Sequence, residues 1–364
     1  MEIVEREITR PVDLCRPDGR LNPGAVGWSR TPLHRTALRE APGPAGWGRN
    51  KRWEYWGVVT PTHVVGLTIS NLDYAAVHQL WVLVRATGEV IDAGALAPLA
   101  LGTRLPASLG LGPARGTALG PGGAERLALA IDEAPSSDPT PTTVSGLAVP
   151  AGAVDPGRET RLRARSPRVQ LDLRTRRLPG GEAMCVVVPW DVRRFQYTVK
   201  DLAVPMVGTI TVDGVTTQVG DGAWGVLDHG RGRWPYSMTW SWAAGSGEVG
   251  GTRLGLQLGG RWTEGTGSTE NALVVDGVTH KISEELTWEY SREDWLRPWR
   301  VVGERVDATF TPFHARHAVT KLGVLAGDTT QCFGVWDGWA ADDDGRDHPL
   351  TGLVGWAEEA HNRW

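Results

Sequence analysis

Along most of the chain, apolar residues either alternate with polar ones or gather in short runs rich in valine, threonine and tryptophan. Alternation with a period of two is typical of β-strands that bury one face. Such runs occur at 51–70, 78–90, 169–175, 184–190 and 195–200, and no segment has the periodicity of a convincing amphipathic helix. We therefore expect an all-β fold with few helices.

Two Asp-Gly pairs give the clearest local signals. Asp213-Gly214 separates VGTITV from VTTQV, and Asp276-Gly277 separates NALVV from VTHKI. Asp-Gly between two alternating runs favours a hairpin turn in which both central residues have positive φ, so the sequence predicts two β-hairpins. Further strands are expected at 251–262, 285–290, 307–312, 330–340 and 351–360. Their spacing indicates antiparallel sandwiches or barrels.

The chain is long enough, at 364 residues, for two domains. Six prolines within the first 50 residues exclude a long helix or a central strand there, so we expect an extended arm. From about Ala93 to Asp155 aromatic residues are missing, which indicates loops around weak strands such as Glu125–Ile131. The strand signals place a first domain at 1–200 and a second domain at 201–364.

Composition and charge exclude several classes of protein. The net charge is −4 with acidic and basic residues interspersed, so no basic surface favours nucleic acid or an anionic membrane. The charged N-terminus and the lack of a long apolar stretch favour a cytoplasmic protein that does not enter the membrane. Three widely spaced cysteines exclude a disulfide framework, and nucleotide-binding and nucleophile-elbow motifs are missing. We expect neither cofactor nor metal.

Eighteen tryptophans stand against four phenylalanines and five tyrosines, and several gather in Asp221–Trp242, DGAWGVLDHGRGRWPYSMTWSW. Carboxylate, imidazole and guanidinium groups among indoles suit a polar site in an apolar pocket. Gly230 and Gly232 predict a turn in this segment. Asp228 is the candidate acid or base, because apolar neighbours raise the pKa of a carboxyl group. If the strand instead continues, His229 faces the opposite side from Asp228.

A second polar stretch, GSTENALVV, precedes a predicted hairpin strand and adds Glu270 to the candidate catalytic residues. Glu270 or His229 would position a water molecule or accept a second proton. The candidate substrate-binding residues are mostly indoles, which stabilise positive charge by cation–π contact. They are Trp224, Arg231, Trp234, Tyr236, Trp240, Trp242, Asn271, Trp288 and Trp299. The same groups also fit ordinary turns and a core that favours large rings, and both interpretations stay open.

Arg231 follows Asp228 by three residues, and two arrangements are open. A direct ion pair would lower the pKa of Asp228 and make it a poor proton donor at neutral pH. If Arg231 points outward or toward a ligand anion, Asp228 stays in an apolar wall with a raised pKa. We favour the second arrangement, because the surrounding glycines and tryptophans provide little polarity to compensate a buried ion pair.

Several segments resemble a known bacterial family. VLDHGRGRWPYSMTWSW, GGRWTEGTGSTENALVVDGVTHKI, FTPFHAR and GLVGWAEEAHNRW resemble the domain-of-unknown-function 2804 family, and the match extends upstream through WEYWGVV and VVVPW. More remotely, the chain is similar to two-domain lipocalin-like proteins that include carotenoid 1,2-hydratases and Diels–Alderase-type cyclases. In those hydratases an Asp in a D-x-x-x-G-type turn protonates an isolated double bond, and the segment from Asp228 to Gly232 is similar to that turn.

This resemblance implies two antiparallel lipocalin-like β-barrel or sandwich domains. Together with the candidate residues it favours a cofactor-independent lyase, hydratase or isomerase that acts on a hydrophobic, unsaturated small molecule by acid–base catalysis in a Trp-lined pocket. Two other functions stay open. One is a lipocalin-like protein that only binds a hydrophobic ligand, and the other is a pericyclic cyclase that folds its substrate and needs no titrating acid.

Overall fold

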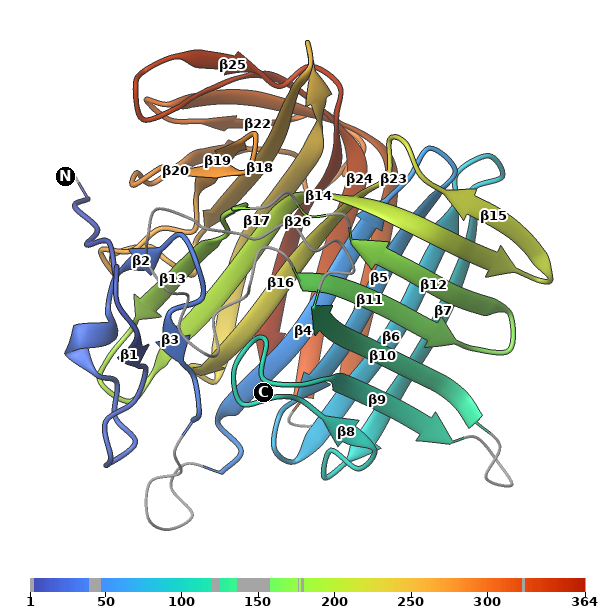
Figure 1. Ribbon diagram of the computed structural model, residues 1–364, viewed down its shortest axis with the longest axis horizontal. Coiled ribbons are helices and arrows are strands. Elements are labelled where there is room, and N and C mark those ends of the chain that lie inside the picture. The colour runs from blue at the N-terminus through green and yellow to red at the C-terminus, as the bar shows by residue number, and fades with distance from the viewer. Residues whose placement is uncertain are drawn as a thin grey trace.

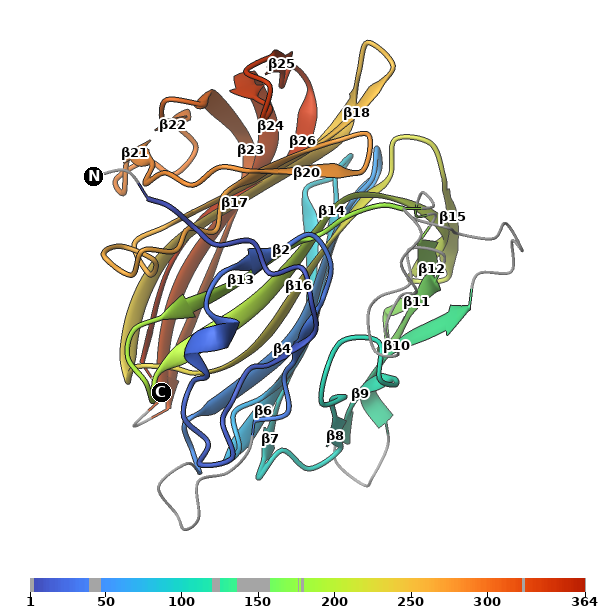
Figure 2. The same cartoon turned by 60° about the vertical axis from the view of Figure 1, so that its left-hand side comes forward.

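The computed structural model describes residues 3–38, 47–119, 125–135, 158–175, 177, 180–322 and 325–363. Over these residues the chain forms strands and one short 3-10 helix, η1 (Pro23–Ala25), so the predicted all-β fold is confirmed. The strands build two large, curled, antiparallel sheets that pack against each other (Figures 1 and 2). None of the described helices is long and apolar enough to cross a membrane.

The first sheet has 14 strands and contains most of the N-terminal half of the chain. In spatial order its main path is β7 (Glu89–Pro98), β6 (Ala75–Val84), β5 (His63–Asn71), β4 (Asn50–Val59), β16 (Trp224–Arg233), β14 (Phe195–Val212), β12 (Val169–Thr175), β11 (Arg158–Arg165), β10 (Glu125–Pro135), β9 (Ala114–Leu119) and β8 (Thr103–Arg104). Three strands lie off this path: β13 (Met184–Pro189), β15 (Val215–Val219) and β2 (Trp28–Ser29). β14 and β16 are neighbours at the centre of this sheet.

The second sheet has 10 strands and is built from the C-terminal part. In spatial order it contains β20 (Val278–Lys281), β19 (Ala272–Val275), β18 (Thr252–Gly260), β17 (Ser237–Val249), β26 (Leu353–Arg363), β24 (Leu325–Ala341), β23 (Val306–Leu322), β22 (Trp299–Val302) and β21 (Thr287–Glu289), with β25 (Asp347–Pro349) beside β24. Two short strands of the N-terminal arm, β1 (Val12–Asp13) and β3 (His34–Arg35), form a separate parallel pair.

Alternation along the central strands divides the side chains between two environments. On β4, Trp56 and Val58 point into the core of the first sheet, while Tyr55 packs against indoles of the second sheet. The second sheet has its own core, which includes Trp299 and Phe310. A third apolar cluster lies where the sheets meet and includes Trp81, Val226, Trp242, Phe333 and Trp356. One face of each central strand therefore belongs to the contact between the sheets.

Both predicted Asp-Gly hairpins are confirmed. Asp213 and Gly214 join β14 to β15 with φ of 47° and 83°. Asp276 and Gly277 join β19 to β20 with φ of 48° and 87°. These are the positive φ values that the Asp-Gly sequence favours.

The turn predicted at Gly230 and Gly232 is wrong, because β16 continues through both residues and pairs with β4 without a break. The glycines are needed there for space. A Cβ at Gly230 would lie 2.2 Å from Trp53, and one at Gly232 would lie 2.2 Å from the side-chain oxygen of Gln196. Glycine inside a strand often marks close approach of a neighbour, and here it leaves room for these two side chains.

The chain passes from the first sheet to the second at residues 234–236, between β16 and β17. Residue 200, the predicted domain boundary, lies within β14 of the first sheet. The division into folding domains at that residue stays a prediction. Between 93 and 155, where loops around weak strands are predicted, the structure shows the end of β7 and strands β8, β9 and β10, of which β10 contains the predicted strand Glu125–Ile131. Residues 120–124 and 136–157 lie outside the described part.

Candidate active site

A buried group of charged side chains lies between the sheets, on one face of β14 and β16. Lys200 pairs with Asp228 in the strand register, and its Nζ lies 3.1 Å from Asp228 Oδ1. The same Nζ lies 3.3 Å from Oε1 of Glu270, which approaches from the segment before β19. Thr198 donates a hydrogen bond of 3.1 Å to Asp228. The Asp228 side chain keeps 12% of its exposure, whereas those of Lys200 and Glu270 are more deeply buried.

Trp242 supports the ammonium group of Lys200. The Lys200 Nζ lies 4.0 Å from the centroid of the indole ring, a cation–π contact. Trp242 is fixed in turn, because its Nε1 donates to Gln257 Oε1 at 2.9 Å and its ring meets those of Tyr55 and Trp356 edge-on. This face of Trp242 thus stabilises a charge of the protein itself.

A third carboxyl group belongs to Glu358 of β26. Its Oε1 accepts a hydrogen bond of 2.8 Å from Trp240 Nε1, and the residue is buried. Tyr55 lies in the same region, and burial together with the charge of Glu358 raises the pKa of its hydroxyl group. We call Lys200, Asp228, Glu270 and Glu358 the acid cluster.

Among the ion pairs of the described residues, Lys200 is the only cation in contact with Asp228 and Glu270, while Arg316 acts on Glu358 through its charge alone. Burial raises the pKa of Glu270 to about 7 against the opposing charge of Lys200, and the charge of Asp228 adds to this increase. Burial also raises the pKa of Glu358 to about 7. Although burial lowers it, the pKa of Lys200 is raised overall by Asp228 and Glu270. The acid cluster therefore holds protons that are exchangeable near neutral pH.

Five indoles beside the acid cluster form one contiguous group. We call Trp53, Trp190, Trp234, Trp240 and Trp262 the indole cluster. Trp234 stacks on Trp262 at 5.5 Å, and its ring centroid lies 5.0 to 5.9 Å from those of the other three. Trp53, Trp190 and Trp240 are only half-buried. The indole cluster thus reaches the surface at three rings, and one of these, Trp240, contacts Glu358.

His229 and Arg231 lie on the opposite face of β16 from Asp228, as alternation requires. There Glu54 of β4 accepts hydrogen bonds from His229 Nδ1 at 2.9 Å and from Arg231 Nη2 at 2.8 Å. Although burial raises it, the pKa of Glu54 is lowered overall by these two partners. Burial lowers the pKa of His229 and favours the neutral imidazole. The structure therefore does not bring His229 together with Asp228 and Glu270.

Arg231 does not pair with Asp228, as predicted, but the predicted outward orientation is wrong. Its side chain is 1% exposed and also donates to the carbonyl oxygens of Trp53, Gly230 and Pro106. These acceptors provide the polarity that the sequence did not indicate. The predicted apolar wall around Asp228 is also wrong, since Lys200 lies directly against its carboxylate.

The remaining candidate residues are spread over the molecule. Trp234, Trp240 and Trp242 lie at the acid and indole clusters, as described above. Trp224 stands at the start of β16, four residues before Asp228. Tyr236 lies in the exposed turn after β16, and Arg49 lies over its ring.

Three further candidates have their contacts within the second sheet and its core. The amide of Asn271 is buried, where it accepts from the Gly259 N–H and donates to the Glu284 carbonyl oxygen. Trp299 lies in the core of the second sheet, and Trp288 packs against that core. The structure does not bring these three residues to the acid cluster.

Sequence reasoning missed Lys200, Tyr55, Trp53 and Trp262, and it assigned no role in the site to Glu358. A signal for Glu358 was present, because strand alternation through LVGWAEEAHNR places Glu358 on the same face as Trp356. For Lys200 the signal was weaker, since its partners come from other strands.

Two further features bear on ligand binding. Among the described residues, no three His, Cys, Asp or Glu side chains converge in an arrangement that could hold a metal ion. The register of β14 against β16 shifts between Asp201 and Val204, which forms a bulge. A cavity of about 40 Å³ opens beside this bulge, and Leu202, Arg177 and Arg253 contribute to its lining. The residues that line it include none of the acid cluster. The predicted pocket along Asp221–Trp242 stays a prediction.

The fold and this site define a class of protein: two packed antiparallel β-sheets with a buried cluster of ionisable groups between them. Within that class, the chain belongs to the family described as domain of unknown function (DUF2804), which matches residues 5–364. The family identification made from the sequence is confirmed. No curated protein matches the chain.

The solved structures that are similar to this one at low sequence identity include three proteins. Kievitone hydratase from Nectria haematococca is 12% identical, with 88% of this chain and 90% of that chain covered and a TM-score of 0.48. A putative AttH protein from Nitrosomonas europaea is 13% identical, with coverage of 88% and 96% and a TM-score of 0.49. The protein CghA is 11% identical, with coverage of 86% and 88% and a TM-score of 0.45.

Proposed function

We propose that the protein is a cofactor-independent acid–base enzyme, a hydratase-type lyase or an isomerase, that acts on a hydrophobic unsaturated small molecule at the acid cluster. One observation carries this proposal. Glu270 has a pKa of about 7 and shares the ammonium group of Lys200 with Asp228. A general acid is most effective when its pKa lies near the working pH, and a second carboxylate nearby provides the matching base.

In the hydratase direction, the protonated Glu270 gives its proton to one carbon of a double bond, and the other carbon becomes cationic. A water molecule adds to this cation, and Asp228 accepts the proton that the water loses. The sum is one alkene and one water converted to one alcohol, and the proton gained by Asp228 returns to Glu270 by exchange with water before the next turnover. Lys200 contacts both carboxyl groups, so it stabilises the Glu270 carboxylate as it forms. An isomerase would use the same pair, with the second proton taken from the substrate.

The indole cluster supports the choice of an apolar substrate. Trp53, Trp190 and Trp240 are half-buried, and we place the approach of the substrate along these rings. Indole faces bind flat apolar groups and stabilise positive charge. Trp242, which the sequence assigned to this role, has one face occupied by Lys200, so Trp240 is the better candidate.

Mass spectrometry in H₂¹⁸O and in D₂O tests this function with a panel of terpenoid alkenes, conjugated polyenes and enones. We expect a product with ¹⁸O for a hydratase, or with deuterium alone for an isomerase. Glu270→Gln and Asp228→Asn should each lower turnover by about 10²-fold or more. Tryptophan fluorescence should show that both variants still bind the substrate.

The rate should fall as the pH rises through about 7, because Glu270 then loses its proton. A pericyclic cyclase would show no such pH dependence and would incorporate neither isotope. Binding of the panel compounds without turnover would support the alternative of a ligand-binding protein. Unchanged turnover in both variants would remove the acid–base proposal.

A further inference from the structure

The N-terminal arm places a buried carboxylate next to the residue that precedes Glu270. Glu5 Oε1 accepts a hydrogen bond of 3.0 Å from the Thr269 N–H, and Glu5 Oε2 accepts one of 2.9 Å from the Thr269 hydroxyl. Lys281 of β20 forms an ion pair with Glu5. The Glu5 side chain is only 1% exposed, whereas the neighbouring Val4 is almost fully exposed. The arm thus places a buried carboxylate against the second sheet.

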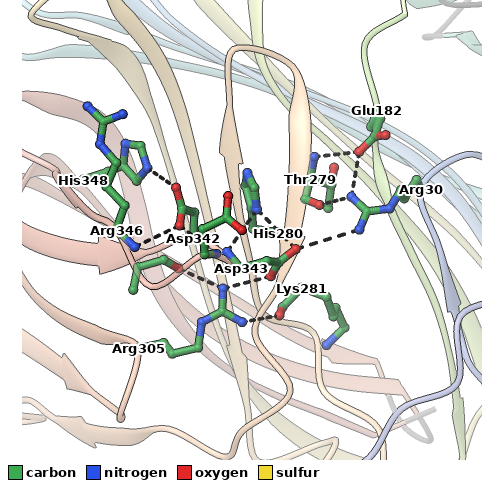
Figure 3. Close-up of polar contacts among 12 residues, drawn as sticks. Arg30, Glu182, Thr279, His280, Lys281, Arg305, Asp342, Asp343, Arg346 and His348 are labelled. Atoms are coloured by element: carbon green, nitrogen blue, oxygen red, sulfur yellow. Dashed lines mark hydrogen bonds and ion pairs between the residues drawn. The ribbon is translucent and has the colours of Figure 1, made fainter. Parts of the chain in front are cut away.

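A second contact fastens the arm to the same strand. Arg30 donates to the carbonyl oxygen of Thr279 in β20 and to the carboxylate of Glu182, and it lies 3.8 Å from Asp343 (Figure 3). Glu7 also pairs with Arg30. This contact is more exposed than the Glu5 contact, and it lies farther along the arm. The arm therefore meets β20 at two points, of which only the first adjoins the acid cluster.

Lys281 lies next to the start of the Glu270 segment, because its Nζ donates a hydrogen bond to the hydroxyl of Thr269, the residue before Glu270. Burial lowers the pKa of Lys281, and the charges of both Glu5 and Glu270 act in the opposite direction. Arg305 adds a second positive charge near Lys281 and donates to its carbonyl oxygen (Figure 3). Glu5 neutralises Lys281 in the native arrangement. Without Glu5, Glu270 would be the carboxylate left to balance the Lys281 ammonium group.

On the side of the first sheet, Glu270 faces Lys200 of β14 and Asp228 of β16. Glu358 of β26 completes the negative groups of the same cluster, and it interacts with Lys200 and Asp228. These charges are supplied by strands of the two sheets, while the charge at Lys281 is set by the arm. The arm thus controls one of the charges around Glu270 without touching it.

We propose that Glu5 is a positioning residue for Glu270. By neutralising Lys281 and holding Thr269 in place, the N-terminal arm keeps Glu270 able to donate a proton beside Asp228 and Lys200. The role of Glu5 in catalysis rests on the proposed function, but the electrostatic coupling of Glu5 and Lys281 to Glu270 does not. It can be measured in the free protein without a substrate.

The experiment is a pH titration of the Glu270 carboxyl carbon by ¹³C NMR, assigned by comparison with Glu270→Gln. In Glu5→Gln the uncompensated Lys281 should lower the pKa of Glu270 by about one unit or more. The protonated fraction at pH 7 would then fall from about one half to about one tenth. Lys281→Met removes the positive charge and should shift the pKa in the opposite direction. Glu7→Gln, which changes the exposed contact of the same arm, is the matched control and should leave the pKa unchanged.

If Glu5 and Lys281 had only structural roles, Glu5→Gln and Lys281→Met would change stability but would not shift the pKa of Glu270 in opposite directions. Equal Glu270 pKa values in wild type, Glu5→Gln and Lys281→Met would overturn the coupling. If Glu5→Gln does not fold, the double variant Glu5→Gln with Lys281→Met removes both charges of the pair, a change that buried pairs often tolerate. Its Glu270 pKa should stay near the wild-type value, and a fall of a unit would contradict the proposal. A wild-type pKa near the ordinary value would instead count against the proposed function.

Discussion

Replacing Lys200 by methionine should lower the free energy of unfolding at pH 8 by about 3–5 kcal/mol, because it leaves buried carboxylates without their shared cation. Lys200 is the only group that contacts both Asp228 and Glu270 among the ion pairs of the described residues. The loss should shrink at pH 5, since Glu270 and Glu358, with pKa values of about 7, are then protonated. Urea unfolding at both pH values measures the effect.

The control for this variant is Lys321→Met, which removes an exposed lysine from β23. It should change the free energy of unfolding by less than about 0.5 kcal/mol at either pH. If Lys200→Met were as stable as Lys321→Met at pH 8, the carboxyl groups of the acid cluster would not depend on Lys200 for compensation.

Glu270→Gln should make the folded protein more stable than wild type at pH 8. The pKa of Glu270 is about 7 in the folded chain, above the unfolded value of about 4.3. The folded state therefore binds more protons between these values, so wild-type stability falls as the pH rises through this window. For one such group the fall is about 4 kcal/mol at most. Glutamine cannot ionise, and the variant should lose much of this slope.

The matched control is Glu359→Gln, one residue from Glu358 but on the other face of β26. Hydrogen bonds from Arg292 and Tyr290 lower the pKa of Glu359 overall, although burial raises it. This carboxylate therefore contributes stability that is present above the unfolded pKa and lost as the pH falls. Its glutamine variant should be less stable than wild type at pH 8, the opposite of Glu270→Gln. Unfolding curves of both variants from pH 5 to 8 test the difference in sign.

The sequence predicts local structure correctly where the preferences of a few neighbouring residues determine it. The hairpins at Asp213 and Asp276 follow from backbone preferences of two residues, and most strands follow from alternation. Gly230 and Gly232 predict a turn, but glycine is found both in turns and where a neighbour packs closely against a strand. Only the neighbouring strands, which bring Trp53 and Gln196 against them, distinguish the two.

The site was harder to predict because its members come from strands far apart in the chain. Asp228 and Glu270 were identified from local chemistry, but the register of β14 against β16 decides that Lys200 meets Asp228. That pairing also explains why Asp228 is not in an apolar wall. His229 and Arg231 were grouped with Asp228 through the predicted turn, and the continuous strand puts them on the other face.

The acid cluster should hold exchangeable protons at neutral pH, and ¹³C NMR titration of the glutamate carboxyl carbons in the wild-type protein measures this property. Glu270→Gln and Glu358→Gln assign the two signals. Because the groups share the field of Lys200 and Asp228, the apparent values describe the cluster as a whole. We predict that both signals titrate near pH 7. Titration of both near the ordinary value of about 4.3 would show that the acid cluster holds no such protons.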